Sequence, residues 1–283
     1  MAAVAPARRS LAGRTGRFRL IAVDLDGTLL RSNGTASART RRALALIEPA
    51  DAQLVIVTGR PWRWFQEVRD LVTDEDALVV CLNGAATLRV STGEMVTSCT
   101  VPYEQAARLV ARLRGHRPDV RFAAESTAGF GHEEGYRQRG HSFARPVERV
   151  ETLLRQGNVL KLLAQHPTID AEKLTKAVLA DDPDGVSVTF SSPSVVEIGG
   201  AQATKATGLA RLAATIGVDR GEVLAFGDMP NDVAMLVWAG HGVAVANAHA
   251  EALAAADEVT ASNDDDGVAL VLEREFGQPG ARL

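Results

Sequence analysis

Two aspartates, Asp24 and Asp26, directly follow a short apolar run at residues 20–23. An apolar run with Ile and Val is typical of a buried strand, and open α/β sheets bind ligands at the carboxyl ends of such strands. Because side chains alternate along a strand, both carboxylates are expected to point the same way, while Gly27 lets the backbone turn away. Like charges about 4 Å apart repel by roughly 4 kcal/mol at an effective dielectric near 20, so the pair predicts a compensating metal ion or cationic ligand. An ordinary turn capped by an aspartate is the alternative interpretation.

Residues 53–57 predict a second buried strand, and polar residues again follow its end. Thr58 offers a hydroxyl and Gly59 a backbone amide, which together make a small anion-binding corner. Pro61 suits the first turn of a helix that would follow. The same residues also fit a plain strand-to-helix turn in which Thr58 is only a cap.

The last third of the chain carries another acidic strand end. Residues 223–226 predict a strand that runs into the segment GDMPND at residues 227–232. Its aspartates, Asp228 and Asp232, lie four positions apart, so both can face one cation if a helical turn forms between them. A loop that caps the predicted helix over residues 233–239 is the alternative.

A lysine completes this set of polar residues. Lys205 stands just ahead of a predicted helix over residues 208–216. We expect it to meet the four aspartates and Thr58 at neighbouring strand ends. Hard oxygen ligands without His or Cys suit Mg²⁺ rather than zinc, and a lysine with a threonine suits a phosphoryl group.

Composition limits the class of protein. The chain has 283 residues, of which 46% are hydrophobic and 23% charged, as is ordinary for a soluble globular protein. A net charge of −4 gives no general basic field for nucleic acid, and no apolar run approaches the roughly 18 residues that a membrane span needs. The two cysteines, Cys81 and Cys99, lack metal-site spacing and are expected to be buried free thiols, as in a reducing cytoplasm.

Signals along the chain predict a tail, a core and an insertion. Residues 1–18 are rich in Ala and Arg but lack the apolar segment of an export signal, so a disordered tail is expected. Alternating strand and helix signals in residues 19–84 and 191–283 predict a Rossmann-like, doubly wound parallel sheet. Residues 85–190 mix short strands and helices without an acidic strand end, which predicts an inserted α/β cap domain.

One segment of the predicted insertion is polar and rich in glycine, at residues 129–141. A mobile surface loop is the simpler interpretation. The alternative is that Arg137, Arg139 and His141 read the substrate, because binding residues often lie on loops.

The order of these motifs resembles the haloacid dehalogenase (HAD) superfamily and, within it, the Cof-type phosphatases of subfamily IIB, which carry a large cap after the second motif. The segment DLDGT at residues 24–28 matches the first motif, Thr58 the second, Lys205 the third and residues 227–232 the fourth. Ala206, where such proteins often have Gly, and the Met-Pro pair in the fourth motif are departures that concern positioning more than chemistry.

The resemblance implies a Mg²⁺-dependent phosphatase of small phosphorylated metabolites such as sugar phosphates. Asp24 would attack phosphorus and form an aspartyl phosphate, and Asp26 would act as general acid and then as general base. Asp24, Asp228 and, by family analogy, the backbone carbonyl of Asp26 would hold the metal, with Asp232 steadying its ligand shell.

The same resemblance assigns the phosphate group to four residues, namely Thr58, Gly59, Lys205 and Asn231. A phosphomutase or phosphoryl transferase shares such a core, and a binding module without turnover is a further alternative. A binding module has no need of both Asp24 and Asp26. The sequence predicts a small-molecule partner and neither nucleic acid nor membrane, and it leaves the substrate and the oligomeric state open.

Overall fold

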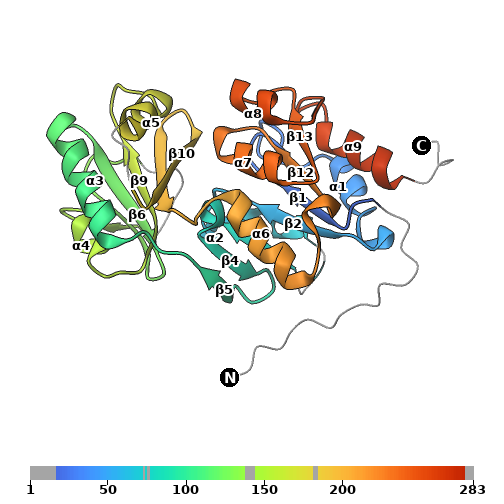
Figure 1. Ribbon diagram of the computed structural model, residues 1–283, viewed down its shortest axis with the longest axis horizontal. Helices are drawn as coiled ribbons and strands as arrows, with labels where there is room; N and C mark the ends of the chain where they lie inside the picture. Colours follow the sequence, from blue (N-terminus) through green and yellow to red (C-terminus); the bar gives the residue numbers. More distant parts are fainter. Residues whose placement is uncertain (1–16, 73, 75–76, 138–143, 181–183, 278–283) are drawn as a thin grey trace.

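The computed structural model describes residues 17–72, 74, 77–137, 144–180 and 184–277. In this part of the chain the strands form two sheets, each covered by its own helices, and the two resulting units lie side by side (Figure 1). We call them the first and the second layer, in the order in which the chain enters them.

The first layer contains the predicted doubly wound sheet. Its strand order over the described residues is β14-β13-β12-β1-β2-β3-β4-β5, in which the strands from β14 to β3 are parallel and β4 and β5 are antiparallel. The prediction of a Rossmann-like parallel sheet is thereby confirmed. The strands are β1 (Leu20–Val23), β2 (Gln53–Val57), β3 (Leu78–Cys81), β4 (Ala86–Arg89), β5 (Met95–Ser98), β12 (Val223–Gly227), β13 (His241–Val245) and β14 (Glu258–Thr260).

Helices cover both faces of this sheet because its central strands are apolar on both sides. On β1, Ile21 and Val23 face the cluster that contains α1 and α9, whereas Leu20 and Ala22 face α6, α7 and α8. Such burial on both faces is expected for a parallel sheet. The helices are α1 (Ala38–Leu44), α2 (Trp62–Phe65), α6 (Lys205–Ile216), α7 (Pro230–Trp238), α8 (Ala250–Ala255) and α9 (Gly267–Phe276). Short 3₁₀ turns lie at Glu48–Ala50, Gln66–Leu71, Leu82–Gly84 and Arg220–Glu222.

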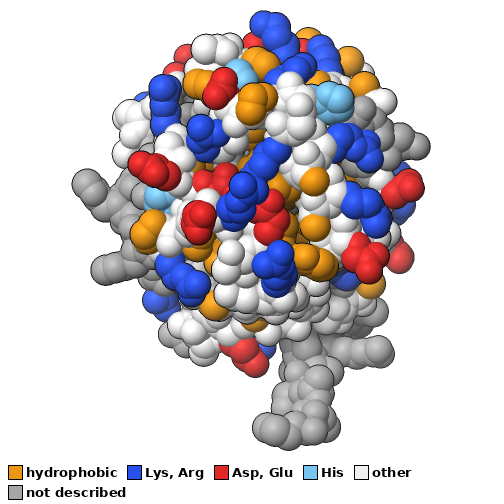
Figure 2. Space-filling view, turned by 90° about the vertical axis from the view of Figure 1, so that its left-hand side faces the viewer, with side chains coloured by type: hydrophobic (Ala, Val, Ile, Leu, Met, Phe, Trp, Pro, Cys, Tyr) orange, Lys and Arg blue, Asp and Glu red, His pale blue; other side chains and the backbone are white. Residues whose placement is uncertain are grey.

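The second layer is a mixed sheet with the order β10-β11-β9-β6-β7-β8, antiparallel except between β7 and β8. Helices α3 and α4 lie on its outer side, away from the first layer (Figure 1). Basic and acidic side chains of the described residues are interspersed over this outer end (Figure 2). The elements are β6 (Arg121–Ser126), β7 (Gly129–His132), β8 (Arg145–Pro146), β9 (Val159–Gln165), β10 (Val186–Ser192), β11 (Val195–Gly200), α3 (Tyr103–His116), α4 (Glu151–Leu154) and α5 (Ala171–Leu179).

The two faces of the second sheet differ in polarity. Side chains of one face, such as Phe122 and Ile198, pack in a cluster with α3, α4 and α5. The opposite face carries Glu125 on β6, its direct partner Lys161 on β9, and Glu197 on β11. These charged residues belong to the face turned toward the first layer.

The expected domain boundaries need correction. Strand β4 pairs with β3 and β5 pairs with β4, so residues 85–98 continue the first sheet. Strand β11 pairs with β9 and β10, so it belongs to the second layer rather than to the predicted core segment 191–283. The partner of a strand is not visible in its local pattern, which is why the sequence placed both boundaries too early. We propose that the insertion spans residues 101–200.

Two local expectations also change. Residues 1–16 of the predicted tail lie outside the described residues, but Phe18 is only 2% exposed and stacks on His241, so it is part of the core. In the predicted surface loop, residues 129–132 form β7, and the carboxylate of Glu133 is buried and accepts the amide of Phe122. The sequence missed both because an isolated buried residue carries no periodic signal.

Arg139 and His141 lie outside the described residues. Cys81 is a buried free thiol, and burial raises its pKa to about 12, whereas the free thiol of Cys99 is only partly buried. Of the helices in the described ranges, none is long and apolar enough to cross a membrane.

Candidate active site

Three carboxylates converge at the carboxyl ends of the central strands. Asp24 follows β1, and Asp228 and Asp232 follow its parallel neighbour β12. Each offers an oxygen within 4.8 Å of the others, and all three residues are buried. The fold therefore brings together acids that are about 200 positions apart in the sequence, at the sheet edge that the motifs predicted.

Lys205 lies between two of these acids. Its Nζ donates to Oδ1 of Asp24 at 2.5 Å and to Oδ1 of Asp232 at 2.6 Å, and the residue is 1% exposed. Lys205 is the first residue of α6, where Thr204 caps the helix. Burial alone would lower the pKa of Lys205, but Asp232 and Asp24 outweigh burial and raise it. The lysine therefore stays charged at neutral pH.

The lysine does not balance all of the negative charge. Burial raises the pKa of Asp24 well above its ordinary value, against the opposing effect of Lys205, and neighbouring carboxylates raise it further. Burial also raises the pKa of Asp228 to about 7, with Asp232 adding to the shift and a hydrogen bond from Thr28 at 2.8 Å opposing it. A divalent cation would relieve this repulsion, and the buried, all-oxygen donor set fits Mg²⁺.

The loop around Asp232 fixes its position. Its Oδ2 accepts the backbone amides of Asp228 at 3.2 Å and Met229 at 3.1 Å, at the start of α7. In the loop after β1, Gly27 has a φ of +82°, and a Cβ there would clash with the Asp228 carboxylate. Glycine is therefore required on steric and conformational grounds where the two loops meet.

Asp26 has a different partner. Its side chain is 57% exposed, and its carboxylate accepts two hydrogen bonds from Arg60, from Nε at 2.7 Å and from Nη2 at 2.6 Å. Although β1 ends at Val23 and strict alternation ends with it, the charge of Asp26 contributes, besides burial, to the raised pKa of Asp24 and of Asp228, so the expected proximity of the two carboxylates stays a prediction. Arg60 was not among the predicted site residues, since a paired hydrogen bond between a guanidinium and a distant carboxylate cannot be recognised from the local sequence.

The Thr58–Gly59 corner lies beside this pair. Thr58 is buried, and its hydroxyl accepts the amide of Arg60 at 3.0 Å, so it does cap the turn. The carbonyl of Gly59 accepts Nζ of Lys161 from the second layer at 2.8 Å. The corner is thus held by contacts from both layers.

Asn231 is held by an amide that sequence reasoning did not assign to the site. Its Nδ2 donates to Oδ1 of Asn83 at 3.1 Å, and both residues are buried. Oδ1 of Asn231 is buried without a hydrogen-bond partner in the described structure. Asn83 follows β3 as Thr58 follows β2 and Asp24 follows β1, and this shared position after a parallel strand was the available signal.

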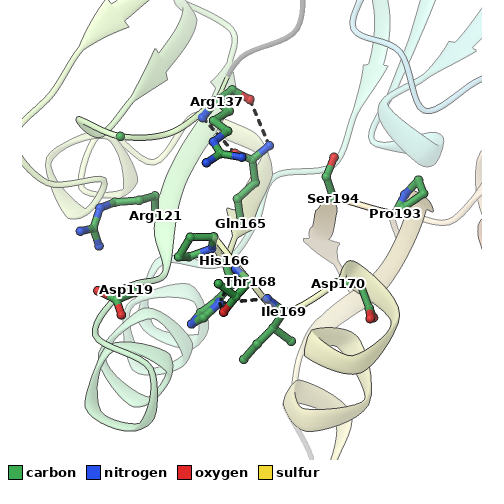
Figure 3. Close-up of a pocket in the computed structure, with 12 residues that line it drawn as sticks. Asp119, Arg121, Arg137, Gln165, His166, Thr168, Ile169, Asp170, Pro193 and Ser194 are labelled. Atoms are coloured by element: carbon green, nitrogen blue, oxygen red, sulfur yellow. Dashed lines mark hydrogen bonds between the residues drawn. The ribbon is translucent and has the colours of Figure 1, made fainter.

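A separate cavity of about 550 Å³ lies in the second layer (Figure 3). Arg137 and Gln165 line it and exchange two hydrogen bonds of 3.0 Å between side-chain and backbone atoms. Gln165 is four residues beyond Lys161 on β9, which corresponds to about 13 Å along a strand. The aspartate cluster does not line this cavity, so the chemistry described above lies elsewhere.

Comparison with known proteins agrees with this geometry. Residues 21–272 match the family model of the haloacid dehalogenase-like hydrolases. The 5-amino-6-(5-phospho-D-ribitylamino)uracil phosphatase YwtE of Bacillus subtilis is 28% identical over 91% of this chain and 98% of its own length. The pyridoxal phosphate phosphatase YbhA of Escherichia coli is 27% identical over 89% of this chain and 96% of its own. Among solved structures, BT1666 of Bacteroides thetaiotaomicron, a HAD phosphatase by its title, is 27% identical, with a TM-score of 0.76 over 94% of this chain and 99% of its own.

Because the family model covers most of the sequence, the chain belongs to the haloacid dehalogenase-like hydrolases. It is an enzyme of the phosphoric monoester hydrolase type, and its resemblance to the Cof-type phosphatases is confirmed. The sugar phosphatase BT4131, of HAD subclass IIB by its title, shares the fold with a TM-score of 0.74 at 22% identity.

Proposed function

We propose that this protein is a cytoplasmic, Mg²⁺-dependent phosphatase of small phosphorylated metabolites that works through an aspartyl phosphate on Asp24. The observation that carries the proposal is the buried cluster of Asp24, Asp228 and Asp232 with Lys205 inserted between two of its members. A cluster that holds more acid than its lysine balances suits a divalent cation, and the cation with the lysine suits a phosphate dianion.

Asp24, Asp228 and the backbone carbonyl of Asp26 would hold the cation, and Asp232 would steady its shell while fixing Lys205. When bound, Mg²⁺ supplies the positive charge that lets an anionic carboxylate approach an anionic phosphate. Burial and the neighbouring Asp232 raise the pKa of Asp228, and this disfavoured negative charge is the feature of the chain that favours such a cation.

The chain's own residues would carry the reaction in two displacements. An oxygen of Asp24 attacks phosphorus, and the bond from phosphorus to the leaving oxygen breaks while Asp26 donates a proton to that oxygen. Asp26 then removes a proton from a water molecule that attacks the same phosphorus. The bond between phosphorus and the Asp24 oxygen breaks, which releases inorganic phosphate and restores the carboxylate.

The phosphate oxygens would be bound where their charge increases during attack. Lys205 supplies a full positive charge, and Thr58, the amide of Gly59 and Nδ2 of Asn231 supply hydrogen-bond donors. All four lie at the ends of neighbouring strands or at the helix starts beside them. The named substrates of YwtE and YbhA are phosphorylated small molecules, which supports this substrate class for the present chain.

The decisive experiment is turnover of a panel of phosphorylated metabolites by the wild type and by Asp24→Asn, with Mg²⁺ present. Loss of a nucleophile ordinarily costs orders of magnitude, so the variant should fall to about a hundredth of normal or less. Acid-quenched wild type should carry one phosphoryl group by intact mass, and the variant none. The control is Asp170→Asn, which replaces one good helix cap of α5, in the second layer, by another. Normal turnover by Asp24→Asn would refute covalent attack by this residue.

A further inference from the structure

A buried ion pair in the second layer reaches across to the candidate active site. Lys161 on β9 and Glu197 on β11 are 3% and 8% exposed, and Nζ of the lysine lies 3.1 Å from Oε1 of the glutamate. Both also contact the first layer. Lys161 donates to the carbonyl of Gly59 at 2.8 Å, and Oε2 of Glu197 accepts Nδ2 of Asn83 at 2.6 Å.

The hydrogen bonds continue from Asn83 to the aspartate cluster. Oδ1 of Asn83 accepts Nδ2 of Asn231, which lies in the first turn of α7 between Asp228 and Asp232. An uninterrupted chain of polar contacts therefore leads from the second sheet to the loop that carries two of the clustered acids. The described reaction steps make no use of either Lys161 or Glu197.

The chemistry of these groups gives the chain of contacts a direction. A carboxylate can only accept, so Glu197 requires the NH₂ group of Asn83 and turns its carbonyl toward Asn231. Asn231 must in turn present its NH₂ group, one N–H of which binds Asn83 while the other remains for an anion. If both amides turned over, Asn83 would place an oxygen against Glu197, and Asn231 would place an acceptor where the phosphate needs a donor.

The backbone at Asn83 is held in an unusual conformation. Leu82, Asn83 and Gly84 all have positive φ, of 55°, 57° and 90°. Such a conformation is uncommon for leucine and persists where the surroundings determine it. A Cβ at Gly84 would clash with the carbonyl of Thr204, directly before Lys205. The segment is therefore fixed against the start of α6, and Asn83 is kept between the two layers.

We propose that Lys161 and Glu197 are positioning residues for the phosphate site. Glu197 orients the amides of Asn83 and Asn231, and Lys161 holds the carbonyl of Gly59, so the phosphate-binding groups are aligned when the second layer is docked. This inference rests on the proposed function, because it assigns Asn231 and the Gly59 corner to phosphate. It gives the second layer a role in phosphate binding itself, separate from recognition of the leaving group.

The central test is Glu197→Gln, which keeps the shape of the side chain and removes its acceptor-only character. Because Lys161 can only donate, a glutamine would keep its oxygen toward that lysine and present its NH₂ group to Asn83, which favours turning both amides over. We expect kcat/KM for para-nitrophenyl phosphate with Mg²⁺ to fall about 10- to 100-fold, the range that small misplacements of binding groups produce. The Kd of inorganic phosphate, measured by calorimetry with Mg²⁺, should rise in the same variant.

Glu133→Gln is the matched control. Glu133 is also a buried carboxylate of the second layer, where it pairs with Arg114 and accepts the amides of Phe122 and Val150. Both variants should unfold at lower temperature, but only Glu197→Gln should change kcat/KM and phosphate affinity of the folded protein. Equal losses in the two variants would mean that Glu197 has only a structural role.

A double-mutant cycle with Asn231→Ala separates positioning from general damage. If Glu197 acts through Asn231, Glu197→Gln should add little to the loss already caused by Asn231→Ala. If the losses in kcat/KM of the two single variants multiply in the double variant, the proposal is overturned. Phosphate affinity also distinguishes failure of the positioning role from failure of the proposed function. A wild-type protein that binds phosphate but hydrolyses no ester would refute the proposed function alone. Unchanged phosphate affinity in Glu197→Gln would refute the positioning role, whatever the turnover.

Discussion

Arg60 binds Asp26 through two parallel hydrogen bonds, with Nε 2.7 Å from Oδ2 and Nη2 2.6 Å from Oδ1. A guanidinium fork of this kind fixes the plane of a carboxylate, which a lysine cannot do. Asp26 is the proposed proton donor to the leaving group. Both of its oxygens accept from Arg60 in this structure, so we expect the fork to hold the carboxylate in place and to release one oxygen when that oxygen carries the proton. The two aspartates of the first motif thus have separate cationic partners, Lys205 for Asp24 and Arg60 for Asp26.

Arg60→Lys should therefore impair the acid step more than the attack on phosphorus. The variant keeps the charge and loses the fork, so we expect kcat for alkyl phosphates to fall about tenfold, which is less than the 10²- to 10⁴-fold that complete loss of a general acid costs. Aryl phosphates need little protonation and should lose less. Arg41→Lys, at an exposed pair with Asp70, is the control. Steady-state kinetics on both substrate types provide the comparison, and equal losses would contradict the role of Arg60.

Removal of divalent ions should abolish turnover. Without a cation, the clustered carboxylates repel a phosphate dianion as well as each other, so a chelator should silence the enzyme and Mg²⁺ should restore it. Ca²⁺ should restore little, because its larger and more flexible shell misplaces the nucleophile. Phosphate release after chelation and re-addition of each ion measures the effect. Full turnover in the presence of chelator would remove the metal from the mechanism.

The effect of Mg²⁺ on stability should depend on pH through Asp228. Its pKa rises from 3.8 in the unfolded chain to about 7 in the metal-free fold, so its contribution to stability is full below about pH 4 and is lost as pH rises through 7. Mg²⁺ needs the ionised carboxylate, and its increase in Tm should therefore be larger at pH 8 than at pH 5.5.

Asp228→Asn provides the matching variant. At pH 8 it removes a buried charge, so the metal-free variant should unfold at a higher temperature than the metal-free wild type, by about 2–4 °C per kcal/mol gained. Its Tm should respond little to Mg²⁺. Scanning calorimetry with chelator or Mg²⁺ at the two pH values measures both effects. An equal Mg²⁺ response at both values would contradict the assignment to Asp228.

The clustering of the acids could be predicted from the sequence, because neighbouring parallel strands must end at the same edge of the sheet. Asp24 and Asp228 each follow an apolar run, and β1 and β12 lie side by side as that argument requires. The partner of Asp26 was not predictable. The direction of its side chain depends on the turn after Val23, and Arg60 reaches it from the end of another strand.

The division of the chain into two layers was harder to predict from the sequence, because it too depends on contacts between distant segments. Residues 86–89 and 195–198 look like similar short strands, but hydrogen-bond partners place the first in the parallel sheet and the second in the other layer. Lys161 and Glu197 were likewise invisible as a pair, because their proximity depends on the register of two strands that are far apart in sequence. Local patterns identify strands, whereas long-range pairing decides which charges meet.

The polar face of the second sheet should determine which metabolite is used. Glu125 lies directly opposite Lys161 and pairs with Arg63 of the first layer, whose guanidinium lies 4.6 Å from the ring centre of Phe130. These groups lie at the junction of the layers, and Glu125 is buried there. Burial raises the pKa of Glu125, and Arg63 opposes that shift.

We expect Glu125→Gln to change the ranking of phosphorylated metabolites while hydrolysis of a small aryl phosphate stays within about tenfold of normal, since binding contacts remote from phosphorus discriminate between substrates. The contrasting variant is Arg137→Ala. Substrate reading by Arg137 was the alternative to a plain surface loop, but Arg137 lines the separate cavity (Figure 3), so its replacement should leave the ranking unchanged. Relative kcat/KM values across one metabolite panel test both variants. A changed ranking in Arg137→Ala with an unchanged one in Glu125→Gln would return specificity to the segment around residue 137 and away from the junction of the layers.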